Sequence, residues 1–252
     1  QLQGRNGFKP AARPTVRKRS GWINSFWDYV ESQYTEVECM TRNILPKPKK
    51  TKSSAVQSSY HPFTVEEYFM LVDATETTNR GRGDPELKDL IIVGAHTDCR
   101  LGELTYMKLD CVGDDWFQVE DSKTANGIRR IPIHKDIQQI IARLKQTSQD
   151  AQSEYLFSGL SANNKYANRS NGEGKRFGNL KDDLGFKGRK YGYHSFRSTL
   201  SNPFESAGVA ENFAARIIGH KVDSMTYGLY SKDIPWVDKV KTMARIKYER
   251  LA

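Results

Sequence analysis

Helix-start signals recur along this chain and set the main constraint on its fold. Thr64 and Glu67 form a capping box, in which a hydroxyl and a carboxylate each satisfy a backbone amide at a helix start. Asp84 followed by Pro85 is a second start signal, because proline is pre-organised for the first helical position. Four later segments also favour helix, and Pro203 is expected to kink or break the third of them. They are residues 136–146, 175–184, 194–206 and 210–218.

A strand-type pattern occurs around one turn. Residues 116–120 and 129–133 alternate between apolar and polar side chains on either side of Asn126-Gly127, which predicts a β-hairpin. The expected fold is therefore mainly α with a small antiparallel β-sheet, an α+β domain.

Composition divides the chain into parts. Residues 15–33 read as one amphipathic helix with a strongly aromatic face, which needs a partner. Residues 46–59 are rich in Pro, Lys and Ser, as expected of an extended linker. We expect a partial helical domain over 1–45, a second domain over 60–232 and a tail helix over 233–252. Because the chain begins at Gln1 without methionine, we also expect it to be a fragment.

The positive charge of the chain gathers at its N-terminal end. Residues 1–52 carry 11 Lys and Arg against 4 Asp and Glu, out of a net charge of +9 for the whole chain. Such an arm suits a polyanion such as DNA, and a solubilising tail is the alternative. The sequence contains neither a secretory signal nor a membrane span, so an intracellular protein is expected. The three cysteines and the histidines at 61, 96 and 134 lack ligand spacing, so no metal site is expected.

Several residues suited to phosphate chemistry follow one another along the second domain. His194 and Arg197 stand at helical i and i+3 positions and can address one group together. Arg100 lies upstream with Glu103 three residues on, and His220 lies downstream. Arginines hold non-bridging phosphate oxygens, and a tyrosine needs such cations or a base to become a nucleophile. Two tyrosines follow, at positions 227 and 230.

Five motifs in this order carry a resemblance to a known family. They are R-L-G-E-L, D-S-K-T-A-N-G-I-R-R-I-P-I-H, H-S-F-R, I-I-G-H and T-Y-G-L-Y-S. Together, over roughly residues 60–232, they resemble the tyrosine recombinase or phage integrase family, most closely integrases of prophages and genomic islands. The first helix is similar to the end of the family's DNA-binding, core-binding domain.

The resemblance implies a nucleophile and an acid. Tyr230 would attack the scissile phosphate and become joined to a DNA 3′ end, and Tyr227 would pack nearby. Lys123 on the hairpin would be the general acid for the leaving 5′ oxygen. Other basic residues near the hairpin are Arg129, Arg130 and Lys135.

The resemblance also assigns the phosphate clamp. Arg100 and Arg197 would hold the phosphate, and His220 would donate a hydrogen bond to it. His194 would serve as base or proton carrier for the nucleophile. Glu103 would either support this site or stabilise the fold.

The same resemblance implies the biological role and the partners. The enzyme would integrate and excise a prophage or other mobile genetic element without cofactor, metal or ATP. Its partners would be double-stranded DNA attachment sites and three further copies in a tetramer, with DNA-bending and directionality factors. It would work in the bacterial cytoplasm at the nucleoid. The tail helix would dock on a neighbouring protomer or fold onto its own domain.

Two features depart from the family pattern. Asp98 stands where glycine is common, and could pair with Arg100 or point outward. Tyr230 lies ten residues after His220, one more than is usual in the family. Two rival functions remain, a type IB topoisomerase-like activity and a DNA-binding protein with a decayed site, which Asp98 would favour.

Overall fold

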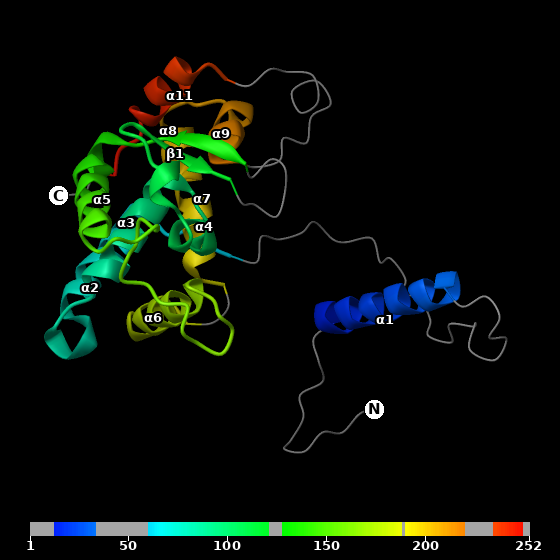
Figure 1. Cartoon of the computed structure of the whole chain (residues 1–252). Helices are drawn as coiled ribbons and strands as arrows, with labels where there is room; N and C mark the ends of the chain where they lie inside the picture. The colour runs from blue at the N-terminus through cyan, green and yellow to red at the C-terminus, as the bar shows by residue number, and fades with distance from the viewer. Residues whose placement is uncertain (1–12, 34–59, 121–127, 188–189, 220–233, 249–252) are drawn as a thin grey trace. The chain divides into compact units, whose positions relative to one another are not determined.

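The computed structural model describes residues 13–33, 60–120, 128–187, 190–219 and 234–248 (Figure 1). The chain divides into two compact units, 1–57 and 58–252. The described part of the first unit is helix α1 (Arg13–Gln33), which confirms the helix expected there. Its aromatic face is open, with Trp22 and Phe26 each 63% exposed. Its assignment to a core-binding domain stays a prediction.

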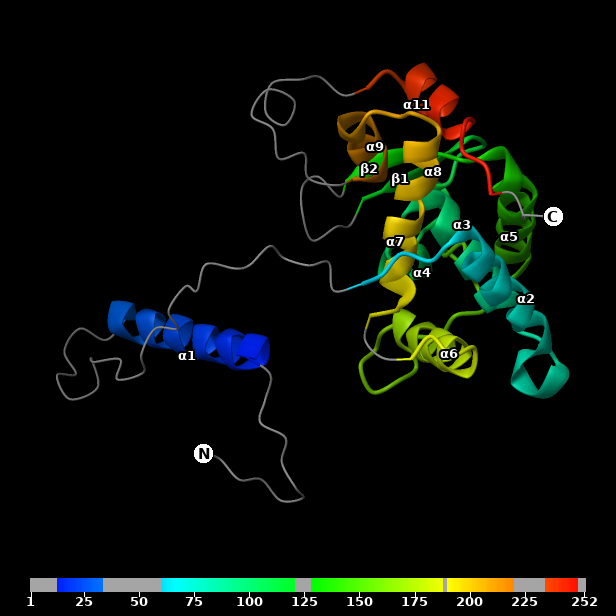
Figure 2. The same ribbon diagram turned by 180° about the vertical axis from the view of Figure 1, so that it is seen from behind.

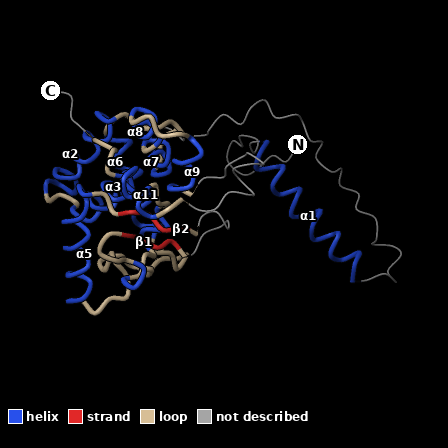
Figure 3. The backbone as a smooth tube through the Cα atoms, turned by 90° about the horizontal axis from the view of Figure 1, so that it is seen from above, coloured by secondary structure: helices blue, strands red, loops and turns tan. Residues whose placement is uncertain are grey.

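The second unit is mostly helical and carries one two-stranded antiparallel sheet, so the expected fold class is confirmed. Figure 3 shows the two strands among helices and loops. Its helices are α2 (Val65–Gly81), α3 (Pro85–Thr97), α4 (Leu101–Thr105), η1 (Leu109–Cys111), η3 (Lys135–Ile137), α5 (Gln138–Asp150), α6 (Ser170–Asp183), η4 (Tyr193–Ser195), α7 (Phe196–Thr199), α8 (Ser201–Ser206), α9 (Glu211–Ile218) and α11 (Trp236–Met243).

The predicted start signals and the predicted hairpin are present. Glu67 Oε2 accepts the Thr64 amide at 2.9 Å, and the Thr64 hydroxyl accepts the Glu67 amide at 3.2 Å. Asp84 Oδ1 accepts the Leu87 amide at 3.0 Å at the start of α3. Strand β1 (Trp116–Val119) pairs with β2 (Arg129–Pro132). The turn between them, residues 121–127, lies outside the described residues.

The segment predicted as helix over 194–206, with a kink or break at Pro203, forms three short helices. Because Pro203 has no N–H, it cannot bond to the carbonyl of Thr199, and its ring would clash with that carbonyl. Helix α7 accordingly ends at Thr199, and Pro203 lies in the first turn of α8, where a missing amide hydrogen costs nothing. The break therefore falls one turn before the proline.

Two buried clusters form the core of the second unit, and α7 runs from one to the other. Phe196 belongs to the larger cluster, and Leu200, which follows α7, belongs to the smaller. Met243 at the end of α11 and Ile246 complete the smaller cluster, so the C-terminal segment packs on its own unit. Helices α9 and α11 both contact β2, as Figures 1 and 2 show from opposite sides. None of the described helices is long and apolar enough to cross a membrane.

Candidate active site

A sharp break between α3 and α4 positions Arg100. Helix α3 ends at Asp98, which has a left-handed backbone (φ 55°) and whose amide donates to the Gly94 carbonyl at 3.1 Å. Arg100 then has an extended conformation and stands at the N-cap of α4. This change of direction brings the Arg100 guanidinium, 33% exposed, to the surface beside α4.

Glu103 holds Arg100 from within the first turn of α4. Its Oε2 accepts a hydrogen bond of 2.9 Å from the Arg100 backbone N–H, and its Oε1 accepts one from Arg100 Nη1. Arg129 on β2 also donates to Oε2, at 3.2 Å, and both of these side chains are buried. Burial opposes ionisation of Glu103, but Arg129 and the bonds from Arg100 lower its pKa below the usual value. Glu103 is therefore a charged, rigid support for Arg100.

Arg197 on α7 contacts Asp98, the residue that stands where glycine is common in the family. Its Nη1 donates to the Asp98 backbone carbonyl at 2.8 Å, and its Nη2 lies 3.4 Å from Asp98 Oδ2. Asp98 is 0% exposed, so it does not point outward, and its ion pair is with the second arginine. Burial raises the pKa of Asp98 well above its usual range, with Arg197 and Arg129 opposing.

His194 is a solvent-exposed residue beside Arg100 and Arg197. It lies in η4, which Tyr193 anchors by donating from its hydroxyl to the Leu90 carbonyl on α3. The His194 side chain is exposed, and its ring centroid lies 5.1 Å from that of Tyr60. Burial of part of the ring lowers the pKa of His194, and the charges of Arg197 and Arg100 lower it further. The imidazole is thus neutral at pH 7 and can accept a proton.

A cavity of about 570 Å³ opens beside Arg100. Its lining runs from Arg100 and Glu103 along Tyr106 and Met107 to Gln118 and Glu120 at the end of β1. The turn that carries Lys123 follows Glu120 directly in the sequence. The open space beside the arginine therefore reaches the base of the hairpin.

The structure brings together four of the seven predicted site residues, which are Arg100, Glu103, His194 and Arg197. The other three, Lys123, His220 and Tyr230, lie outside the described residues, as does Tyr227.

Arg129 and Asp98 support this site in a way that the sequence motifs do not indicate. In the sequence Arg129 is one of several basic residues near the hairpin, but in the structure it is buried against Glu103. Its position offered one signal, since Arg129 alternates with the exposed Arg130 and so takes the same face as the buried Ile131. No comparable signal marked Asp98 as a partner of Arg197.

Several solved structures that share this fold are integrases. A lambda integrase dimer bound to a COC′ core site aligns with a TM-score of 0.58 and 20% identity, over 84% of this chain and 75% of that one. The Tn1549 transposon integrase in complex with a circular intermediate DNA aligns with a TM-score of 0.58 and 15% identity, over 94% and 80%. A lambda integrase tetramer bound to a Holliday junction aligns with a TM-score of 0.55 and 20% identity, over 82% and 58%. No curated protein matches the chain in sequence.

The fold, together with a family profile over most of the second unit, identifies a tyrosine recombinase catalytic domain. The sequence profile described as the phage integrase family matches residues 63–234, from just before α2 to just before α11. The chain belongs to the phage integrase family.

Proposed function

We propose that this protein is a site-specific DNA recombinase that integrates and excises a prophage or other mobile genetic element through a covalent 3′-phosphotyrosine intermediate. One observation carries the proposal. Arg100, His194 and Arg197, from segments almost 100 residues apart, meet around two buried carboxyl groups in a chain of the phage integrase family.

The two arginines have different roles in holding phosphate. Arg100 is partly exposed and can contact a non-bridging oxygen directly, with Glu103 fixing its direction. Arg197 is only 6% exposed and acts mainly as a buried positive charge, where the low dielectric strengthens its attraction to phosphate. Asp98 pairs with Arg197, whereas Arg100 pairs with Glu103. Because the ion pair of Asp98 is with Arg197, its presence is a weak argument for a decayed site.

The reaction needs a nucleophile, a base and an acid. Tyr230 attacks the scissile phosphorus and forms the phosphotyrosine bond as the bond to the 5′ oxygen breaks. His194, neutral at pH 7, takes the tyrosine proton, and Lys123 gives a proton to the leaving oxygen. His220 donates a hydrogen bond to the phosphate.

The intermediate keeps the energy of the broken phosphodiester bond. A 5′ hydroxyl from the partner duplex then attacks the phosphotyrosine, which reseals the strand and releases Tyr230. The chemistry therefore requires neither ATP nor a metal ion.

The partners follow from this reaction. Strand exchange between two duplexes requires four active sites, and lambda integrase has been solved as a tetramer bound to a Holliday junction. We propose that this chain also assembles as a homotetramer on its attachment sites, in the bacterial cytoplasm. DNA-bending and directionality factors belong to the same proposal, as does docking of the tail on a neighbouring protomer.

A suicide DNA substrate tests the proposal. A nick beside the crossover site lets the 5′-hydroxyl fragment leave, so the covalent protein–DNA adduct accumulates and is seen as a slower band under denaturing conditions. We expect the adduct with the natural chain and with Tyr227→Phe, and none with Tyr230→Phe. The absence of an adduct on any cognate site would refute the catalytic proposal, and relaxation of plasmids that lack the site would favour a topoisomerase.

A modified phosphate tests the role of Arg100 separately. Replacing one non-bridging oxygen of the scissile phosphate by methyl removes the negative charge that Arg100 neutralises. We expect Arg100→Ala to lose at least about a hundredfold in cleavage rate on ordinary DNA and much less on the methylated substrate. An equal loss on both substrates would show that Arg100 does not act through phosphate charge.

A further inference from the structure

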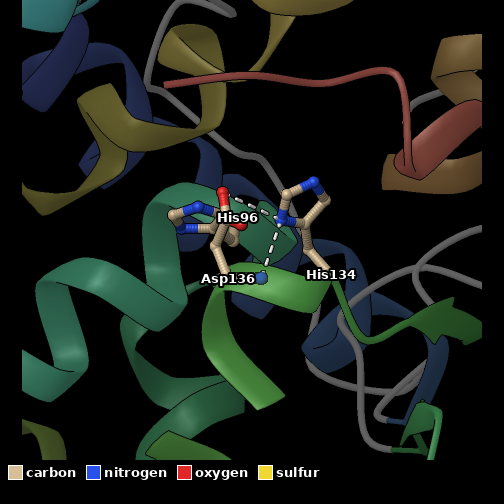
Figure 4. A group of neighbouring side chains, drawn as sticks. All are labelled: His96, His134 and Asp136. Carbon is tan, nitrogen blue, oxygen red and sulfur yellow. Dashed lines mark hydrogen bonds and ion pairs between the residues drawn. The ribbon is translucent and has the colours of Figure 1, made fainter. Parts of the chain in front are cut away.

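Three side chains that the sequence did not connect converge where α3 meets the segment before α5. They are His96 on α3, His134 just before η3, and Asp136 within η3. One ring nitrogen of each histidine and a carboxylate oxygen of Asp136 all lie within 4.8 Å of one another. Figure 4 shows the Asp136 carboxylate between the two imidazoles.

Each histidine ring is fixed by a hydrogen bond to a backbone carbonyl. His96 Nδ1 lies 2.8 Å from the Ile92 oxygen, and His134 Nε2 lies 3.1 Å from the Ile246 oxygen. Because a carbonyl only accepts, both of these nitrogens carry the hydrogen. A neutral ring then has its lone pair on the other nitrogen, which is Nε2 in His96 and Nδ1 in His134. Metal-binding histidines typically donate their other ring N–H to such a carbonyl or carboxylate.

Among the described residues, the remaining lone pairs lack strong donors. His96 is only 4% exposed, and its buried Nε2 has no hydrogen-bond partner within this part of the chain. His134 Nδ1 accepts only a long 3.3 Å bond from the Asp136 amide and lies 3.4 Å from Asp136 Oδ2, a second acceptor. Several acceptors thus face one another, an arrangement that a cation would satisfy.

The distances suit one small metal ion. Ligand atoms about 2.0–2.1 Å from a tetrahedral ion lie roughly 3.4 Å apart, the separation of His134 Nδ1 and Asp136 Oδ2. The Asp136 side chain is 45% exposed, so its carboxylate can adjust its direction and offers an entry path from solvent. Water would complete the coordination. Two imidazoles and one carboxylate favour divalent transition metals such as Zn²⁺ over Mg²⁺ or Ca²⁺.

We propose that His96, His134 and Asp136 bind a divalent transition-metal ion of the zinc class, which fixes the C-terminal segment to its own unit. The segment already meets both histidines. The Tyr248 ring is tilted against the His96 ring, with 4.6 Å between the two centroids, and its hydroxyl donates to the Ala95 carbonyl at 2.6 Å. The Ile246 carbonyl accepts from His134. An ion that locks the two rings therefore also stabilises these contacts.

Equilibrium dialysis of the DNA-free 252-residue chain against Zn²⁺ tests the proposal, with Mg²⁺ in a parallel arm. We expect one Zn²⁺ per chain and no comparable binding of Mg²⁺. At roughly a hundredfold excess over the Kd, Zn²⁺ should raise the unfolding temperature by about 5 °C. Neither readout involves DNA cleavage, so the result is independent of the proposed recombinase activity.

Variants locate the site. Asp136→Asn changes an exposed side chain and should weaken Zn²⁺ binding by at least about tenfold. His134→Gln should weaken it at least as much. Asp114→Asn, at another exposed carboxylate, and His61→Ala should leave the Kd unchanged. The proposal is overturned if the chain does not bind Zn²⁺, if Mg²⁺ binds as tightly, or if Asp136→Asn and His134→Gln bind it unchanged.

Discussion

Replacing Glu103 by glutamine tests whether this buried carboxylate holds the site together. Glu103 accepts three hydrogen bonds, two from Arg100 and one from Arg129. Its side chain is 5% exposed and that of Arg129 is 3% exposed. Glutamine has the same length but only one acceptor oxygen and no charge, so it cannot satisfy all three donors.

The size of the effect follows from this burial. Removing one partner of a buried ion pair costs about 3–5 kcal/mol, and we expect the lower end, since glutamine retains one acceptor. A loss of about 3 kcal/mol is large against the roughly 5–15 kcal/mol by which folded proteins are stable. The free energy of unfolding would be measured by urea denaturation of the natural chain and of Glu103→Gln.

Glu76→Gln is the matched control, because the same chemical change is made at an exposed ion pair. Glu76 lies 2.7 Å from Lys88, and these side chains are 63% and 35% exposed. Such pairs contribute less than about 1 kcal/mol. If Glu103→Gln loses no more stability than Glu76→Gln, Glu103 is not the support described above.

Three other predictions follow from the same contacts. The pKa of Glu103 is lowered in the folded state, so the stability that its charge contributes is complete above the unfolded pKa of about 4.5 and is lost as pH falls through the lower folded pKa. The difference in unfolding free energy between the natural chain and Glu103→Gln should therefore shrink below about pH 4.5, as measured by denaturation at a series of acid pH values. Arg169 donates to three backbone carbonyls at 2.7–2.8 Å, which lysine cannot reach together, so Arg169→Lys should lower the free energy of unfolding by about 2–3 kcal/mol in urea titrations. In Gly94→Ala the added methyl would overlap the Tyr193 hydroxyl, so we expect the free energy of unfolding to fall by about 1–3 kcal/mol. We also expect a lower yield of the covalent DNA adduct, because Tyr193 anchors the helix that carries His194.

Local signals in the sequence predicted much of the fold. The capping box at Thr64, the Asp84 cap and the hairpin alternation depend on neighbouring residues alone, and all three are present. The division of the 194–206 segment was only partly predicted. Pro203 indicated a break, but the break lies at Thr199, because the lost hydrogen bond belongs to the carbonyl four residues earlier.

The motifs predicted Arg100, Arg197 and the supporting Glu103, but not the roles of Arg129 and Asp98. The pair of Arg100 with Glu103 is local in sequence, whereas the pairs of Arg129 with Glu103 and of Asp98 with Arg197 join residues distant in sequence. Arg129 reaches Glu103 only once β2 is placed beside α4, and Asp98 reaches Arg197 only when α3 ends in a left-handed residue. The spacing of His96 and His134 in the sequence predicts no metal site for the same reason, since ligand spacing describes only nearby residues.

Identifying the residue joined to DNA tests the central claim most directly. The adduct trapped on a suicide substrate would be digested with protease and nuclease, and the peptide that retains the nucleotide sequenced by mass spectrometry. We predict that the nucleotide is attached to Tyr230, by a bond that Arg100→Ala forms far more slowly. Attachment to Tyr227 or to any other residue, or the absence of a modified peptide, would contradict the account.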